Sequence, residues 1–292
     1  MMKKLFLAVA IVIVAMLVAL VFLTPRVVPE APLPSPNGYD DFVKAATIVS
    51  RNSFDWNSLS GEALHQLVAT NEPALSLIRT GLTKESRMAP YILAGTNNSH
   101  MSEMALQKLI AHAFCAASRL ALTEGHTNDA AILALDCIRY SHESTRGGVI
   151  IDGLVGVAIQ ANGLARLEEA LPGLDAETSR KVTTGLENLA GKRESPENIF
   201  TREAEWARRG RFGHAGILTQ LIQSFRYRKL LAKAKQKFEK GVTDLQRTKL
   251  RAAAHAYELE HAKPPASARE LVPQYLKSIP LDPATGKELP LN

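Results

Sequence analysis

The chain has 292 residues, of which 46% are hydrophobic, 6% aromatic and 22% charged, with a formal net charge of +6. This length suits one large domain or two small ones, and a chain rich in alanine and leucine but poor in aromatic residues favours helices over a β-sandwich. Two cysteines exclude a disulfide-rich scaffold. We therefore expect an all-α fold, either an irregular helical bundle or a short array of helical hairpins.

The N-terminal segment carries an uncharged apolar run over residues 5–23, behind two lysines. At about 1.5 Å per residue, this run just spans the ~30 Å core of a bilayer. It is longer than the apolar part of a cleaved signal peptide and lacks a small-x-small site at its end, although cleavage after Ala19 is an alternative. We expect residues 1–24 to form a cytoplasmic stub and an uncleaved transmembrane helix whose residues 5–23 contact the lipid bilayer.

The charges beside the apolar run set its expected orientation. Lys3 and Lys4 precede the run, whereas Arg26 is the one nearby basic residue that follows it. The positive-inside rule therefore puts the N-terminus in the cytoplasm and residues 25–292 outside, as in a single-pass protein of the cytoplasmic (inner) membrane with a periplasmic domain. Five prolines lie within residues 25–36, which favours an extended polyproline linker.

Residues 37–242 show apolar residues at the three- and four-residue spacing of helices, which predicts a helical domain. The pattern is clearest from Leu106 to Leu120 and in the helix after the turn near His126. The hairpin over residues 103–144 has the size of a tetratricopeptide unit, but no second copy follows at that period. An irregular bundle is therefore favoured over a regular solenoid.

Two local patterns predict helix boundaries within this domain. Asn71-Glu72-Pro73 has an N-cap residue followed by proline, which indicates that a new helix begins there. The apolar stripe of the last part of the domain changes side at residues 226–229. Either the helix breaks at that point, or two different partners cover its two halves.

Residues 201–251 concentrate the positive charge: 14 basic and four acidic residues give this segment a net charge of +10. The candidate basic face comprises Arg208, Arg209, Arg211, Arg226, Arg228, Lys229, Lys233 and Lys237. One interpretation is a solvated helix surface, and the other is a surface for an anionic lipid, an anionic wall polymer or an acidic envelope protein. Nucleic acid is not an expected partner, because the domain is expected outside the cytoplasm.

The stretch AYELEHAKPPASARELVPQYLKSIPLDPATGKEL, near residues 250–290, resembles the C-terminal module of the major pseudopilins of type II secretion. In that family a helix ending in tyrosine precedes a Tyr-Pro turn, a short helix and an Asp-Pro loop. This chain has Pro264-Pro265 at the turn, and no pseudopilin processing site precedes its apolar run. The resemblance implies that residues 243–292 form a C-terminal helix and a small loop-rich module.

The segments NGYDDFVKAA and RGGVIIDGLVGVA, together with the same C-terminal stretch, are similar to a group of membrane-anchored bacterial envelope proteins. That resemblance implies a fold and carries no activity.

Motifs for catalysis and cofactor binding are absent from the sequence: it has no Gly-x-Ser-x-Gly elbow, Walker loop or His-Glu-x-x-His pair. Glu62/His65 and Glu258/His261 have the Glu-x-x-His spacing of di-iron bundles, but the further glutamates that such sites need do not stand out on apolar faces. We expect surface side chains there, and no catalytic residue, metal or cofactor. The loop over residues 144–148 is expected to be a tight turn, with anion binding before the next helix as the alternative.

The two cysteines are each eleven residues from the turn at His126, so in a helical hairpin Cys115 and Cys137 lie at the same height. Outside the cytoplasm such a pair is able to form a disulfide. The bridge requires the first helix to be covered on two sides, because Cys115 lies opposite that helix's apolar stripe. Without a bridge, Cys137 is a small core residue.

These features favour a non-enzymatic protein that docks or scaffolds envelope or secretion components. The alternative is an envelope hydrolase that acts on wall or glycan polymers, which needs a pair of carboxylates in a cleft. Asp136 and Asp152 are the acidic residues inside strongly apolar stretches. A deep pocket lined by either of them, with a histidine or arginine nearby, would favour the enzyme.

Overall fold

The computed structural model describes residues 32–89, 97–211 and 217–291, with the side chains of 97–101 and 206–227 left out. The chain divides into two compact units, residues 1–32 and residues 33–292. The expected transmembrane helix at residues 5–23 and most of the linker lie outside the described residues. The regular elements of the described residues are helices, with no strand and one isolated β-bridge between Leu281 and Glu288, which confirms the all-α class.

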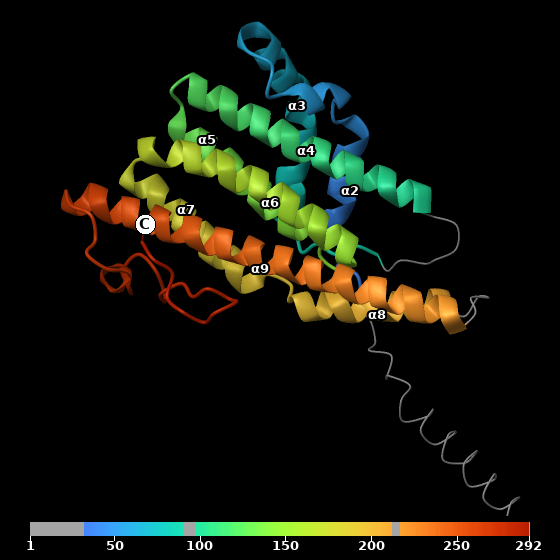
Figure 1. Cartoon of the computed structure of the whole chain (residues 1–292). Helices are drawn as coiled ribbons and strands as arrows, with labels where there is room; N and C mark the ends of the chain where they lie inside the picture. The colour runs from blue at the N-terminus through green and yellow to red at the C-terminus, as the bar shows by residue number, and fades with distance from the viewer. Residues whose placement is uncertain (1–31, 90–96, 212–216, 292) are drawn as a thin grey trace, which may run out of the picture. The chain divides into compact units, whose positions relative to one another are not determined.

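Eight α-helices and three short 3₁₀ helices follow one another in the described part of the chain (Figure 1). The α-helices are α2 (Gly38–Ile48), α3 (Gly61–Gly81), α4 (Asn97–Thr123), α5 (Thr127–Glu143), α6 (Ile150–Ala170), α7 (Ala176–Lys192), α8 (Pro196–Arg211) and α9 (Ile217–His261). The 3₁₀ helices are η1 (Arg51–Asp55), η2 (Leu171–Gly173) and η3 (Ala268–Leu271).

Helices α4, α5 and α6 form the centre of an irregular antiparallel bundle. The α4–α5 turn contains Gly125, whose φ of +82° is in the left-handed region that glycine adopts without strain. Figure 1 shows α4, α6 and α9 side by side, and α6 contacts α4, α5 and α9. Helix α7 packs against α9 and α5, so the long C-terminal helix closes one side of the bundle.

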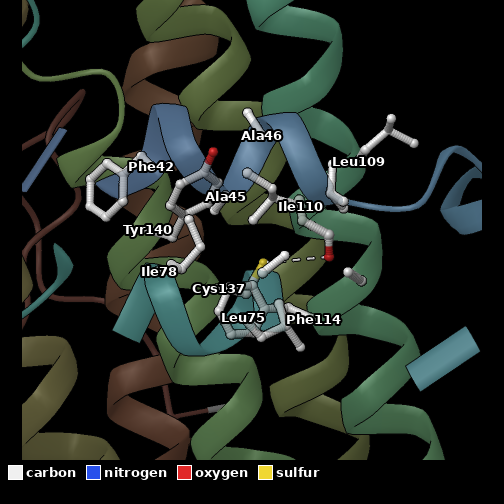
Figure 2. Close-up of a cluster of buried hydrophobic side chains, with 14 of the residues drawn as sticks. Phe42, Ala45, Ala46, Leu75, Ile78, Leu109, Ile110, Phe114, Cys137 and Tyr140 are labelled. Carbon is white, nitrogen blue, oxygen red and sulfur yellow. Dashed lines mark hydrogen bonds between the residues drawn. The ribbon is translucent and has the colours of Figure 1, made fainter. Parts of the chain in front are cut away.

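The largest group of buried apolar side chains lies where α2, α3, α4, α5 and α6 meet. Figure 2 shows Phe42, Leu75, Phe114 and Tyr140, from four different helices, around this centre. The rings of Phe42 and Tyr140 pack edge to face, with centroids 5.3 Å apart. We call this group the apolar core.

The contact between α5 and α6 depends on small residues. A Cβ atom added to Gly163 would lie 2.7 Å from Ile138 Cγ1 and 3.0 Å from the carbonyl oxygen of Ala134. A Cβ atom on Gly156 would lie 2.9 Å from the carbonyl oxygen of Ser141. The two helices therefore approach so closely that only hydrogen fits at these positions.

The helix boundary predicted at Asn71-Glu72-Pro73 is wrong, because α3 continues from Gly61 to Gly81 with Pro73 inside it. Asn71 is fully buried, and its side chain accepts from the Ser50 backbone N–H and donates to Ser53 Oγ and to the Leu67 carbonyl. This side chain ties η1 to α3 instead of capping a new helix. Burial within the tertiary structure overrides the local preference for a helix start.

Helix α9 likewise continues unbroken through residues 226–229, so the change of side in its apolar stripe is not a helix break. The boundary that we placed between residues 242 and 243 falls inside this helix, and the two segments on either side of it therefore share one element. In the described part of α9, Ala234 and Phe238 pack against Ile150 and Ile199.

One helix among the described residues is long and apolar enough to cross a membrane, the stretch Ile150–Gly173. It comprises α6 and η2, and 56% of its apolar window is buried within the protein. Helix α6 also carries the buried polar residues Asp152 and Gln160. Contact with three other helices accounts for its apolar character.

Residues 262–291 form a loop-rich segment that packs on the end of α9. Leu271 and Leu276 are buried against Tyr257 of α9. Arg180 of α7 forms a bidentate ion pair with Glu260, at 2.5 and 2.6 Å, and lies 4.2 Å from the centroid of the Tyr275 ring. These contacts attach the C-terminal segment to both α7 and α9.

Candidate functional site

A cationic surface lies on the first half of α9. The side chains of Arg228, Lys229, Lys233 and Lys237 are exposed, and none of them forms an ion pair within the described part of the chain. Three of them are spaced by four residues, which puts them on one side of the helix. Arg228, five residues before Lys233, lies about 140° around the helix from this row. We call these four residues together the α9 basic face. The other four predicted members, Arg208, Arg209, Arg211 and Arg226, have side chains outside the described residues.

The opposite side of α9 holds this surface rigidly on the bundle. Ala234 and Phe238 are 2% exposed and pack against Ile150 of α6 and Ile199 of α8. The α9 basic face also contains an apolar side chain, because Leu230 is 54% exposed among the cations.

A cleft of about 640 Å³ lies between the end of α3, α5 and α7. Its charged lining comprises Lys84, Glu85, Arg139, Glu143, Arg146 and Lys192. Most of these charges are neutralised within the protein: Lys84 lies 2.5 Å from Asp41, Arg139 lies 3.0 Å from Asp136, and Arg146 forms a bidentate pair with Glu143. The cleft therefore presents a nearly balanced set of charges rather than a free cationic site.

The two acidic residues that we considered for hydrolysis have structural contacts instead. Asp136 pairs with Arg139 and lies 3.9 Å from Arg79, and burial raises the pKa of its carboxyl group against the pull of Arg139. Asp152 is fully buried and accepts the Val149 backbone N–H at 2.9 Å, which caps the start of α6. Neither carboxylate lines the cleft described above or the small cavity described below.

The Glu-x-x-His pairs are also tied to neighbouring groups. His65 lies 3.2 Å from Glu124, whereas His261 lies against the Tyr257 ring and within 3.2 Å of the Tyr275 hydroxyl. Within the described ranges, no group of three or more histidine, cysteine, aspartate or glutamate side chains is placed to hold a metal ion.

A buried polar layer lies where the end of α5, the middle of α6 and the α7–α8 link meet. The link contributes Glu194, which forms a bidentate pair with Arg202 and accepts the Gly147 backbone N–H. Arg202 also donates to the Gly148 carbonyl at 2.9 Å. These contacts confirm that residues 144–148 form a turn, and they fix it against α8.

His142 of α5 occupies the centre of this layer. Its Nε2 lies 2.9 Å from Gln160 Oε1, and the Gln160 amide nitrogen donates to the Gly241 carbonyl of α9 at 2.7 Å. Burial lowers the pKa of His142 to about 4, and the positive charge of Arg193 is the second cause. The imidazole is therefore neutral at pH 7.

A cavity of about 40 Å³ opens within the polar layer, and we call it the Arg193 cavity. Its polar lining includes Ser141, His142, Thr145, Gln160, Arg193 and Glu194. The sequence does not point to His142, Gln160 or Arg193 as a group, because each stands alone in a local pattern that carries no motif. Only the packing of four helices brings them together.

Cys115 and Cys137 are both buried and both free, so the structure does not contain the disulfide that the sequence left open. The pKa of the Cys137 thiol is raised well above its ordinary value, first by a hydrogen bond with Cys115 and second by burial. Helix α4 is covered by α2 and α3 as well as by α5 and α6, which is the two-sided cover that the pairing requires.

The sequence and the structure were compared with known proteins. No protein-family model, no curated protein and no solved structure matches this chain. The resemblance of its C-terminal residues to the pseudopilin module stays a prediction.

Proposed function

We propose that this chain is a non-enzymatic docking protein, anchored in the inner membrane by residues 5–23, whose α9 basic face holds an anionic lipid surface. The observation that carries the proposal is the set of four exposed cations, Arg228, Lys229, Lys233 and Lys237, that lack an acidic partner within the described residues. An unneutralised row of cations is available to a partner of opposite charge.

The exposed Leu230 distinguishes between the possible anionic partners. A hydrated wall polymer offers no apolar surface to a leucine among cations, whereas a lipid surface buries it below the headgroups. The linker supports the same partner. Residues 25–36 reach about 37 Å when fully extended at ~3.1 Å per residue, so the domain stays near the membrane that anchors it.

The hydrolase alternative finds no specific support among the described residues. Asp136 and Asp152 are held in an ion pair and a helix cap. The carboxylate of Glu143, which does line the cleft, accepts hydrogen bonds from Nε and Nη2 of Arg146 through both of its oxygens. A hydrolytic pair needs one carboxyl group to protonate the leaving group and another to act as base or nucleophile.

The proposal is tested with the full chain reconstituted in nanodiscs of neutral lipid and then mixed with vesicles that contain an anionic lipid. Co-sedimentation measures binding. Each basic residue near an anionic surface contributes ~1 kcal/mol, so replacing Arg228, Lys229, Lys233 and Lys237 with glutamine should weaken binding on the order of several hundredfold. Raising the salt from 0.1 to 1 M should also release the protein, because the screening length falls from ~10 to ~3 Å.

A matched control changes one arginine and three lysines of the C-terminal segment, namely Arg269, Lys263, Lys277 and Lys287, to glutamine. These residues are exposed, and the net charge falls by the same amount. The control should bind as the wild type does. Equal binding to neutral vesicles, or equal loss in both variants, would reject the α9 basic face as a lipid-binding surface.

A further inference from the structure

The cleft between the end of α3, α5 and α7 is bounded at both ends. At one end α5 and α7 touch, since a Cβ atom added to Gly185 would lie 2.7 Å from Leu135 Cδ2. At the other end Arg146 donates a hydrogen bond to the Lys192 carbonyl at 3.1 Å. Leu135 and Glu143 both line the cleft and are eight residues apart on α5, which makes this side of it about 12 Å long. About four residues of an extended chain cover that length at ~3.3 Å each.

The segment after α3 forms the wall that faces α7. Arg139 Nη2 lies 3.5 Å from the Leu82 carbonyl, and the Met88 N–H donates to the Arg146 carbonyl at 2.9 Å. Residues 82–88 therefore run beside the second half of α5. The cleft of about 640 Å³ separates this segment from α7, so the two walls face each other across it.

The lining of the cleft argues against two simple kinds of ligand. Lys84, Arg139 and Arg146 are each paired with a carboxylate of the protein, so an anion alone would have to displace that partner. The leucines of the lining are at most 8% exposed and leave little apolar surface for a purely hydrophobic ligand. They are Leu82, Leu135 and Leu189. A ligand with charges of both signs and a small apolar part suits this lining better.

Glu85 and Lys192, on the two facing walls, supply one charge of each sign. Both side chains are exposed, and neither forms an ion pair within the described part of the chain. Both lie toward the Arg146 end of the cleft. The Lys192 backbone binds Arg146, and the pKa of Arg146 is raised first by a hydrogen bond with Glu143 and last by the charge of Glu85. The apolar contact at Leu135 lies at the opposite end.

We propose that this cleft binds an extended segment of a partner protein with the pattern apolar-x-acidic-basic, in either chain direction. A short peptide suits the dimensions and the charges, because it carries both signs and spans the length of α5 in four residues. The cleft and the α9 basic face are separate surfaces, so the inference goes beyond lipid binding and does not rest on it.

The order of the charges follows from the two walls. Gly185, Leu189 and Lys192 form a row on α7, at four- and three-residue spacing. Side chains two residues apart in an extended chain point to the same side, and the next one points to the other. An apolar residue and an acidic residue two positions later therefore face α7, where they meet Leu189 and Lys192. The basic residue that follows faces Glu85.

The experiment uses the full chain in nanodiscs of neutral lipid and four labelled, end-capped peptides of one composition, with fluorescence anisotropy as the measure of binding. Leu-Ala-Glu-Lys and Lys-Glu-Ala-Leu have the expected pattern in the two chain directions. Leu-Ala-Lys-Glu and Glu-Lys-Ala-Leu exchange the charges, and Leu-Ala-Gln-Gln has none. One of the first two should bind about tenfold more tightly than the other patterns, which corresponds to ~1.4 kcal/mol, because two ion pairs replace two like-charge contacts.

Exchanging the charges of the two walls tests the residues directly. The double variant Glu85→Lys/Lys192→Glu keeps the net charge and should reverse the preference, so that a peptide with exchanged charges binds most tightly. The matched control is Glu177→Lys/Lys181→Glu, which reverses an exposed ion pair in the first half of α7 and should keep the wild-type preference.

Three results would overturn the inference. The first is equal binding of the four charged peptides, and the second is binding of Leu-Ala-Gln-Gln as tight as that of the best of them. The third is a preference that the exchange at Glu85 and Lys192 leaves unchanged, or that the control exchange at Glu177 and Lys181 alters equally, since distant charges would then act as strongly as those of the cleft.

Discussion

The apolar core and the polar layer are both buried, yet they are built in different ways. In the core, Phe42, Leu75, Phe114 and Tyr140 meet through surface contact, and each is at most 2% exposed. In the polar layer, each group depends on a specific partner, and Arg193 has none among the described residues. The core holds the helices together through apolar contacts, whereas the polar layer contains groups whose free energy depends on protonation and charge.

This difference explains why the two regions should respond to different perturbations. Contacts between apolar atoms are lost when volume is removed, and they change little with pH. Buried polar groups respond to protonation and to ions, because their free energy depends on charge. The comparison between the two regions is therefore tested by mutations that remove side-chain volume without changing charge, and by mutations that remove a titratable group.

The largest effect is expected in the apolar core. Phe114 is fully buried in α4, so Phe114→Ala should lower the free energy of unfolding by about 4 kcal/mol through lost contacts and the cavity left behind. Urea denaturation at pH 7 and again at pH 5 measures it, and the loss should be similar at both. The control is Phe54→Ala, whose ring is 55% exposed and whose removal should cost under ~1 kcal/mol. Similar losses for both phenylalanines would contradict this account of the core.

The polar layer should instead show a pH dependence. The pKa of His142 is about 4 in the folded protein and near 6.5 in the unfolded chain, so the unfolded chain takes up the proton first. The stability that neutral His142 contributes is complete above pH 6.5 and is lost as the pH falls toward 4. Between pH 7 and pH 5 the wild type should lose about 2 kcal/mol from this group.

His142→Gln isolates this contribution, because glutamine does not titrate and still offers a donor to Gln160. Urea unfolding of the wild type and the variant in anion-free buffer at pH 7, 6 and 5 gives the difference. The gap between the two proteins should shift by about 2 kcal/mol in favour of the variant as the pH falls. A gap that does not change with pH would show that His142 titrates normally.

Two glycines provide a smaller test of how tightly the bundle is packed. Gly163→Ala should lower the free energy of unfolding by about 1 kcal/mol, because the new methyl group meets Ile138 and the Ala134 carbonyl and this outweighs the gain in helix propensity. Gly191→Ala on α7 has no atom within 4 Å of the new methyl group. It should raise the free energy of unfolding by about 0.5–1 kcal/mol. Chemical denaturation of both variants decides, and a stabilised Gly163→Ala would mean that α5 and α6 are able to move apart.

The apolar core was predictable from sequence to a large extent, and the polar layer was not. The three- and four-residue spacing of apolar residues identified α4 and α5, and the turn near His126 gave their pairing, because these signals are local. The continuation of α3 through Pro73 was missed, since Asn71 acts through Ser50 and Ser53, which precede it by about twenty residues.

The candidate sites also show that local sequence signals are predictable and contacts between distant segments are not. A run of basic residues in α9 is visible in sequence, and four of its members are exposed cations in the structure. The Arg193 cavity depends on His142, Gln160 and Arg193, which come from three different elements. No spacing rule connects them, and the defining property of Arg193 is a missing partner, which only the packed structure reveals.

The smallest change in the free energy of unfolding is expected at the two cysteines, which are buried but carry reactive thiol groups. Cys115 and Cys137 are each 1% exposed, so their thiols should react with a labelling reagent only after the protein unfolds, and two should then be counted per chain. As free thiols they act as small apolar groups, and Cys115→Ala should change the free energy of unfolding by ~1 kcal/mol or less. A disulfide would close a loop of about 22 residues and stabilise the fold by about 3 kcal/mol. A count of no thiols in the unfolded protein, together with a loss of that size in Cys115→Ala, would therefore establish the bridge, because a cavity left by one sulfur atom is too small to produce it.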